Sequence, residues 1–495
     1  MQPRAISWHR PWRMIRLAFA RIGRVVFLGA VVFATLLLVR AFDARRQPDL
    51  KPWHTVRLQG EFHGVTRRRV ATMAEYLELE KALFEDLDRV VVNQLPPEDR
   101  GVANRYFRGS PAYTGHAATN WNRTVVLEPD VPRGGVLLLH GLTDSPYSMR
   151  HLARIYGAQG YFVVALRIPG HGTIPAELMR VNRRDWNAAV RLAARHVRDR
   201  IGPDLPFHMV GYSNGGALAL QYALDALEEP NLPPPDGLMV LSPMIAVTPA
   251  AAAGRSIARL GAIPYFEKSR WLDLMPEYMP YKYNSFPANA AYQSHVVSTR
   301  LVRSLARAEA NGSIGRLPPL LAFQSVVDAT VSTPAVVDML YNRLRGPGHE
   351  LVLFNVNTGS NARDFIRAED LRYAHTLFRD DRRNYRLSLL ANAEPNTRRI
   401  AEYSAEPGHA KPKVRALGLE WPAGVYSLSH VAVPMPADDE VYGLQGEIGG
   451  AAPRGEKGVL TVPIDQFMRL YGNPFFSYVE DKIEDYILHR PAGLP

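Results

Sequence analysis

Short apolar runs alternate with amphipathic stretches along the middle of the chain, from residue 122 to residue 356. The apolar runs have the length of buried strands. They lie at residues 123–127, 135–140, 161–167, 206–211, 237–242, 319–324 and 350–356. The amphipathic stretches have helical character, and they lie at residues 147–159, 186–200, 215–228 and 333–344. Strands that alternate with helices predict an α/β fold with a mostly parallel sheet and helices on both of its faces.

Two segments interrupt this alternation. Residues 243–316 lose the strand rhythm and are rich in aromatic side chains. Because this segment follows a central strand, we predict that a lid occupies about residues 246–316. A second irregular insertion is predicted at about residues 357–420, with a helix at 368–378 and strand-like residues at 385–390.

The N-terminal residues carry an uncharged run, Val25–Val39, between two arginines. The run reaches the length of a membrane span if residues 15–23 are included, with Arg21 and Arg24 extending toward the headgroups. We therefore predict a membrane anchor, and the alternative is a signal peptide cleaved near residues 39–41. Six arginines precede the run. The positive-inside rule then puts the N-terminus in the cytoplasm and the body on the extracytoplasmic, periplasmic side.

Outside the alternating region the sequence predicts few regular elements. Amphipathic helices are expected near residues 70–91 and 464–488. A glycine-rich loop at residues 446–458 is expected to face solvent, because no strand-to-helix junction accompanies it. The predicted organisation is an anchor with a cytoplasmic N-terminus at residues 1–46, a membrane-proximal segment at 47–121, and a main domain at 122–495.

Composition excludes several classes of function. The chain has 495 residues, of which 46% are hydrophobic, so it can bury a large core. Its formal charge of +11 is concentrated at the N-terminus, where nine arginines and only one acidic residue, Asp43, precede Gln47. The remaining chain is close to neutral, which argues against a nucleic-acid partner. The absence of cysteine excludes disulfides, thiol catalysis and thiolate metal sites.

The sequence GYSNGG at residues 211–216 lies between a predicted strand and a predicted helix. A serine at the apex of such a turn has a strained backbone, and only glycine fits two positions away on each side, at Gly211 and Gly215. The turn would lift the Ser213 hydroxyl above the sheet as a nucleophile. We expect the backbone N–H groups of Asn214 and of Leu142, in the loop after an earlier strand, to form an oxyanion hole.

Three motifs occur in a fixed order: HGLTDSP at residues 140–146, RIPGHG at 167–172 and GYSNGG at 211–216. Together they resemble the serine α/β-hydrolases of the lysophospholipase and monoacylglycerol lipase branch. The resemblance covers residues 122–356. It implies an α/β-hydrolase fold, a Ser-Asp-His triad in that chain order, esterase-type chemistry through an acyl-enzyme intermediate, and a lid over the acyl pocket.

The resemblance implies that the catalytic acid follows the strand at residues 319–324. Asp328 lies in the loop there and is preferred to Asp338, which falls within the next predicted helix. For the base we choose His430, which precedes a proline-rich loop. Two other histidines remain as candidates, and they are His375 and His409.

The expected protein is a membrane-anchored serine hydrolase that cleaves carboxylic esters, with an ester or lipid as substrate and with no cofactor or metal. Its alternatives are an acyltransferase or a peptidase that uses the same triad, or a non-catalytic membrane-tethered binding protein. The histidines of the first two motifs, His140 and His171, precede the serine and are expected to brace loops by hydrogen bonds. The sequence gives no oligomeric state.

Overall fold

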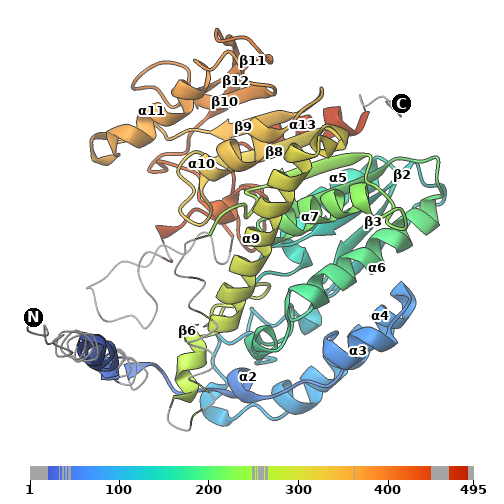
Figure 1. The fold of residues 1–495 in the computed structure, drawn as a ribbon. Helices are drawn as coiled ribbons and strands as arrows, with labels where there is room; N and C mark the ends of the chain where they lie inside the picture. Colours follow the sequence, from blue (N-terminus) through green and yellow to red (C-terminus); the bar gives the residue numbers. More distant parts are fainter. Residues whose placement is uncertain are drawn as a thin grey trace, which may run out of the picture.

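The computed structural model is built around one ten-stranded sheet, in the order β1-β3-β2-β4-β5-β8-β9-β10-β11-β12 (Figure 1). Its strands are β1 (Val125–Leu127), β2 (Gly134–Leu139), β3 (Tyr161–Leu166), β4 (Phe207–Tyr212), β5 (Gly237–Leu241), β8 (Leu320–Ser325), β9 (Glu350–Phe354), β10 (Arg386–Asn392), β11 (Arg399–Ala405) and β12 (Lys413–Glu420). Strands from β3 to β10 in this order pair in parallel, and β1, β11 and β12 pair antiparallel at the two edges. All seven predicted strands are present, so the mostly parallel α/β sheet is confirmed.

The structure describes most of the chain. The described residues are 21–32, 34–35, 38–39, 42, 46–247, 251, 254, 261, 263, 266–361, 363–446, 466 and 468–488.

Helices cover both faces of the sheet, as the alternation predicts. Alternate side chains of each strand enter different cores: Leu137 and Leu139 of β2 join one, and Val136 and Leu138 join the other. The first core is covered by α6 (Arg183–Ile201), α7 (Asn214–Glu228) and α9 (Ala288–Ala310). The second is covered by α5 (Arg150–Ala158) and α13 (Phe476–Leu488). The predicted helix at residues 464–488 is interrupted: residues 466 and 468 are helical, residues 469–475 are not, and α13 begins at Phe476.

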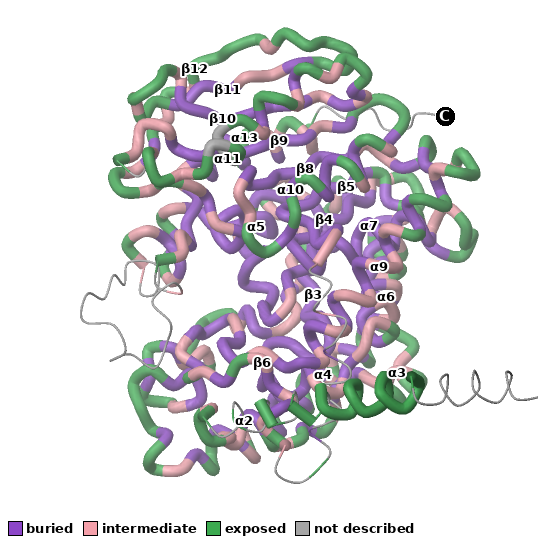
Figure 2. Tube along the Cα trace, turned by 60° about the vertical axis from the view of Figure 1, so that its left-hand side comes forward, coloured by how far each residue is buried: buried purple, intermediate pink, exposed green. Residues whose placement is uncertain are grey.

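The second predicted insertion extends the sheet instead of interrupting the fold. The expected helix is present as α11 (Ala368–Leu377), and the strand-like residues form β10 parallel to β9. β11 and β12 then continue the sheet with antiparallel pairing, so the prediction of an irregular segment was wrong. β12 is mostly exposed at the open edge (Figure 2). Its mixed polar sequence fits a strand with only one neighbour, which needs few apolar residues.

The segment predicted as a lid, residues 246–316, is not one irregular unit. Its second half contains α9, which packs against α7 in the helical layer and belongs to the core. Before α9, a small hairpin joins β6 (Trp271–Asp273) to β7 (Phe286–Pro287). Trp271 is buried with its ring 4.8 Å from that of His54, so it fastens the hairpin to the N-terminal segment.

The N-terminal segment packs on the sheet domain through α2 (Pro52–Thr55), α3 (Gly64–Arg69) and α4 (Met73–Leu87) (Figure 1). Its central contact is a buried cluster of charges. Arg167, after β3, donates to the Glu61 carboxylate at 3.1 Å and to Glu80 at 2.9 Å. Because one buried arginine is ion-paired with two buried glutamates of this segment, the segment is an integral layer of the fold and not a loose linker.

The predicted anchor lies partly outside the described residues. Residues 21–32 are helical and exposed. Within the described part of the chain, no helix is both long and apolar enough to cross a membrane. Most of the predicted glycine-rich loop at residues 446–458 also lies outside the described residues.

Candidate active site

The turn between β4 and α7 holds Ser213 in a strained backbone conformation, with φ 53° and ψ −113°. A Cβ atom on Gly211 would lie 2.4 Å from the carbonyl carbon of Gly215, and one on Gly215 would lie 2.1 Å from the Leu139 oxygen. Neither position therefore accepts a side chain, as the sequence predicts. Non-glycine residues adopt positive φ at an energetic cost, and such strain concentrates at functional sites. Ser213 is also the N-cap residue of α7, where the positive end of the helix dipole favours a nearby anion.

The loop after β2 passes directly beside this turn. A Cβ atom on Gly141 would lie 3.4 Å from Cβ of Ser213 and 2.8 Å from the Tyr212 ring. Only a glycine lets the backbone approach so closely, and the next residue is Leu142. Thr143 follows with a positive φ of 62°, so the chain turns sharply at this point. The loop predicted to supply an oxyanion donor is therefore adjacent to the serine.

Asp328 and His430 meet in the structure, although 102 positions separate them in the sequence. Asp328 lies in the loop after β8, and His430 begins a short 3₁₀ helix, His430–Ala432. The Nδ1 atom of His430 lies 2.7 Å from Oδ2 of Asp328. A carboxylate can only accept, so Nδ1 donates and Nε2 is left as the basic nitrogen. The ring centroids of His430 and Tyr212, the residue before Ser213, are 5.1 Å apart.

The surroundings of Asp328 keep its carboxyl ionised. Burial opposes ionisation, but the contact with His430 and the N–H groups of Val331 and Thr330 outweigh it, so the pKa lies below its ordinary value. Oδ1 accepts those N–H groups at 3.0 and 2.8 Å, and Gln324 donates to Oδ2 at 3.2 Å. An ionised Asp328 can therefore orient the His430 ring and stabilise its positive charge.

The other candidates for the catalytic acid and base make contacts away from the pair of Asp328 and His430. Asp338 is exposed and accepts from Asn342. His409 is exposed, and its Nδ1 lies 3.0 Å from the Pro407 oxygen. His375 lies on α11 with its ring against Tyr403. Of the three histidines considered as the base, His430 is the one with a hydrogen bond to Asp328.

The two motif histidines brace loops, which confirms that prediction. Nε2 of His140 accepts the Ile168 N–H at 3.0 Å, so its proton is on Nδ1 and points to the Gly141 oxygen at 2.8 Å. His171 contacts the oxygens of Ile168 and Pro169 through Nδ1. Burial holds the pKa of His140 well below its ordinary value and lowers that of His171 to about 4. Both rings stay neutral as structural links between the loops after β2 and β3.

A clamp on the segment that carries His430 was not predicted from the sequence. Asp439 accepts from the Tyr147 hydroxyl at 3.0 Å and from Arg150 at 2.8 Å, and its Oδ2 lies 2.8 Å from Nε2 of His151. Arg150 and His151 begin α5 and Tyr147 lies just before it, about 290 positions from Asp439 in sequence. Because no local pattern marks so distant a contact, only the folded structure reveals it.

The loop beside Ser213 contains a second unpredicted feature, a buried acid. Asp144 accepts the Ser145 N–H at 2.9 Å, and burial raises its pKa to about 6. Across a small cavity lies Lys282, whose pKa burial lowers to about 8. The segment that carries Lys282 also touches the loop directly, because the Tyr283 N–H donates to the Thr143 oxygen at 2.7 Å. Among the described residues, no cluster of three acidic or histidine side chains could hold a metal ion.

Comparison with known proteins identifies similar sequences. A family model described as Serine aminopeptidase, S33 (Hydrolase_4) matches residues 130–344. The chain is 30% identical over 220 residues to the thermostable monoacylglycerol lipase of Bacillus sp. (strain H-257), a match that covers 44% of this chain and 79% of that protein. It is 35% identical over 102 residues to the monoacylglycerol lipase of Mycolicibacterium smegmatis, covering 20% of this chain and 35% of that protein.

Solved structures also align with the chain. One is described under LipS and LipT, two metagenome-derived lipolytic enzymes, and is 26% identical with a TM-score of 0.38, covering 47% of this chain and 87% of that one. Another is the monoacylglycerol lipase of Paleococcus ferrophilus, which is 17% identical with a TM-score of 0.34. The match covers 47% of this chain and 87% of that one. The matched family region includes Ser213 and Asp328 and ends before His430.

Proposed function

The chain belongs to the monoacylglycerol lipase-like branch of the α/β-hydrolases, and from this membership we propose that it hydrolyses carboxylic esters of apolar acyl groups through an acyl-enzyme on Ser213. One observation carries the proposal. A strained serine between two obligatory glycines directly follows Tyr212, whose ring lies 5.1 Å from that of His430, and an ionised aspartate orients this imidazole. This combination supplies the nucleophile, base and orienting acid of ester hydrolysis.

In the proposed mechanism, the Ser213 oxygen attacks the ester carbonyl while Nε2 of His430 takes its proton. The N–H groups of Leu142 and Asn214 stabilise the oxyanion of the tetrahedral intermediate. As the intermediate collapses, the C–O bond to the alcohol breaks, and His430 returns the proton to the leaving oxygen. Water then attacks the acyl-enzyme by the same route in reverse, which releases the acid and restores Ser213. Asp328 stays ionised throughout and orients the ring.

We also propose that the segment between β5 and α9 covers the acyl-binding side of the site. Its contact with the loop beside Ser213, from Tyr283 to Thr143, supports this position. Stacking of Tyr281 on Tyr147, with ring centroids 3.9 Å apart, fixes the same segment against the end of the sheet. A cover of aromatic side chains would exclude water and favour apolar acyl groups.

The N-terminal anchor and the periplasmic location of the catalytic domain are further proposals. They rest on the uncharged run Val25–Val39 and on the arginines that precede it. We also propose that the chain divides into the anchor at residues 1–46, the membrane-proximal segment at 47–121 and the main domain at 122–495. An anchor would hold the enzyme close to lipid substrates.

A fluorophosphonate probe tests the proposed nucleophile, because it labels a serine only where a base activates the hydroxyl. We expect the wild type to be labelled at Ser213 and Ser213→Ala to remain unlabelled. Parallel assays with a monoacylglycerol, the matching acyl amide and an alcohol acceptor distinguish a lipase from a peptidase or an acyltransferase. An unlabelled wild type would favour the non-catalytic binding protein.

A further inference from the structure

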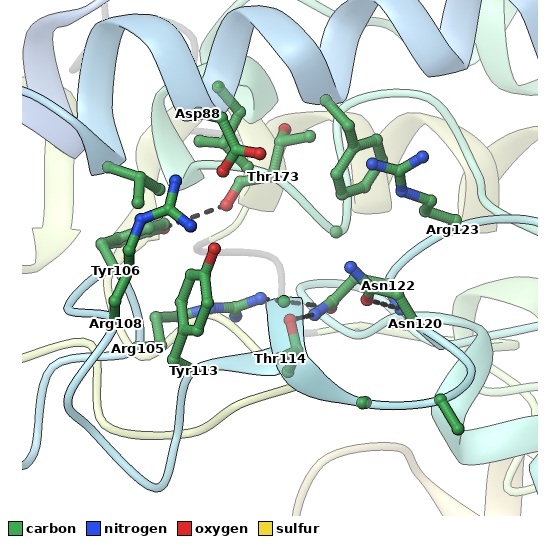
Figure 3. A pocket seen from close by; sticks show the side chains of 17 residues that line it. Asp88, Arg105, Tyr106, Arg108, Tyr113, Thr114, Asn120, Asn122, Arg123 and Thr173 are labelled. Atoms are coloured by element: carbon green, nitrogen blue, oxygen red, sulfur yellow. Dashed lines mark hydrogen bonds between the residues drawn. The ribbon is translucent and has the colours of Figure 1, made fainter.

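A polar cavity of about 460 Å³ lies between the N-terminal segment and the sheet domain, outside the proposed catalytic residues (Figure 3). Its volume falls in the range of about 300–1,000 Å³ that is usual for small-molecule sites. One wall is formed by the end of α4 and the residues after it, and the other by the loop from Arg105 to Arg123. Gly172, the last residue of the RIPGHG motif, and Thr173, which follows it, complete the lining. The cavity therefore exists only because the two parts of the chain pack together.

Three guanidinium groups line this cavity, and they belong to Arg105, Arg108 and Arg123. In Figure 3, Arg108 and Tyr113 lie on one side of the space, and Arg123 and Asn122 lie on the other. The lining contains a single carboxylate, that of Asp88. The cavity thus carries a net positive charge from groups that surround the same space.

Aromatic rings and amides hold these arginines, and carboxylates do not. The guanidinium of Arg123 lies 4.3 Å from the Phe84 ring, and that of Arg108 lies 5.7 Å from the Tyr113 ring. Arg108 donates to the Asn93 amide oxygen at 3.0 Å, and Arg105 donates to that of Asn122 at 3.1 Å. Within the described part of the chain, none of the three arginines has an ion pair with an acidic side chain within 4 Å.

Arg105 is buried, Arg123 is half-buried and Arg108 is exposed, and their surroundings differ from those of two other buried arginines. Arg167 is neutralised by two glutamates, and Arg150 is neutralised by Asp439. A half-buried guanidinium without a carboxylate partner leaves its positive charge and several N–H donors facing the cavity. The positive charge of this cavity is thus available to a ligand.

We propose that this cavity is a second ligand site, which binds the phosphate group of a small molecule through Arg108 and Arg123. Guanidinium groups bind phosphate with paired N–H donors, and phosphate provides the multiple acceptor oxygens that separate arginines can share. The cavity exceeds the size of a single ion, so a glyceryl headgroup fits beside the phosphate. The hydroxyls of Tyr113 and Thr114 line the same space and can hydrogen-bond such a group.

Two hydrogen bonds connect the cavity to the segment near the catalytic region. Arg105 donates to the Lys282 carbonyl oxygen at 3.2 Å, and the Thr173 N–H donates to the Tyr283 hydroxyl at 2.8 Å. Both contacts end on the segment proposed to cover the acyl side of Ser213. A phosphate-bearing ligand would therefore bind next to that cover without touching the proposed nucleophile.

Titration calorimetry on the full-length chain tests the proposal with three probes: sn-glycerol 3-phosphate, inorganic phosphate and glycerol. We expect both phosphates to bind and glycerol to release no heat. Arg123→Gln and Arg108→Gln should each raise the Kd about tenfold or more, because each removes a charged hydrogen bond. The exposed Arg303 on α9 offers a matched control, and Arg303→Gln should leave the Kd unchanged.

The probes also distinguish the source of the ligand. Tighter binding of sn-glycerol 3-phosphate indicates a lipid-derived headgroup, and equal binding of inorganic phosphate indicates the free anion. Arg108 is exposed at the rim, so its variant keeps the test valid even if Arg123→Gln fails to fold. Absence of binding by both phosphates, or the same Kd in the wild type and all three variants, would overturn the proposal.

Discussion

At the residue scale, one hydrogen bond to Asp328 orients His430, the proposed base. We expect His430→Ala to lower kcat for ester hydrolysis nearly as much as Ser213→Ala does, because the members of a triad act as a unit. The exposed His409 is the matched control, and His409→Ala should stay within about twofold of the wild type. Steady-state kinetics on a p-nitrophenyl ester measure both variants. If His409→Ala were the more damaging substitution, the assignment of the base would be wrong.

Asp144 makes stability depend on pH. Burial raises its pKa from 3.8 to about 6, so the folded chain binds this proton more tightly than the unfolded chain. The resulting stabilisation is complete below about pH 3.8 and is lost as the pH rises through 6. A shift of about two units corresponds to about 3 kcal/mol.

Asp144→Asn cannot ionise but retains an oxygen that can accept the Ser145 N–H. We expect its free energy of unfolding, relative to the wild type, to increase by about 3 kcal/mol between about pH 3.5 and pH 7. Urea unfolding at several pH values measures this difference, with the exposed Asp381→Asn as a control that should show no such trend. A difference that does not change with pH would contradict the raised pKa.

At the scale of elements, Arg167 joins the N-terminal segment to β3. Arg167→Met would leave Glu61 and Glu80 as buried carboxylates without a cation, which should cost about 3–5 kcal/mol in the free energy of unfolding. The exposed Arg399, 3.4 Å from Glu394, is the control, and Arg399→Met should change stability by less than about 1 kcal/mol. Urea unfolding compares the two. A decrease of less than about 1 kcal/mol in the free energy of unfolding of Arg167→Met would show that the charge cluster is not needed for stability.

The sequence predicts buried elements better than edge elements, for a physical reason. Strands with two neighbours, such as β4 and β5, are continuous apolar runs because both of their faces are buried. β12 has one neighbour and carries charges along an exposed strand, so its pattern resembles a loop. The turn at Ser213 is also predicted well, because its strand, glycines and helix are adjacent in the sequence.

The rest of the candidate site depends on contacts between distant residues. His430 follows Asp328 by 102 positions, and three histidines could have supplied the base. The clamp at Asp439 and the arginine-lined cavity are formed by side chains from separate segments. The periodicity of apolar residues does not indicate such contacts, because the packing of the folded chain decides which distant side chains meet.

At the scale of the whole molecule, the proposed anchor precedes a folded body that begins near residue 47. Deletion of residues 1–46 should leave kcat/KM for a water-soluble short-chain ester within about twofold and release the protein from the membrane fraction. Deletion of residues 1–121 should instead abolish soluble expression, because Arg167 loses both buried carboxylates. Fractionation and ester assays measure both outcomes. Retention of the shorter deletion in membranes would show that another surface binds lipid.

The central claim is that Ser213 is the nucleophile of an ester hydrolase. The most direct test is kcat for hydrolysis of a medium-chain monoacylglycerol by purified wild type and Ser213→Ala, with the Tm of each measured in parallel. We expect a loss of about a millionfold in kcat with an unchanged Tm, since the substitution removes one oxygen and leaves the turn intact. Hydrolysis by Ser213→Ala at a rate near that of the wild type would contradict it.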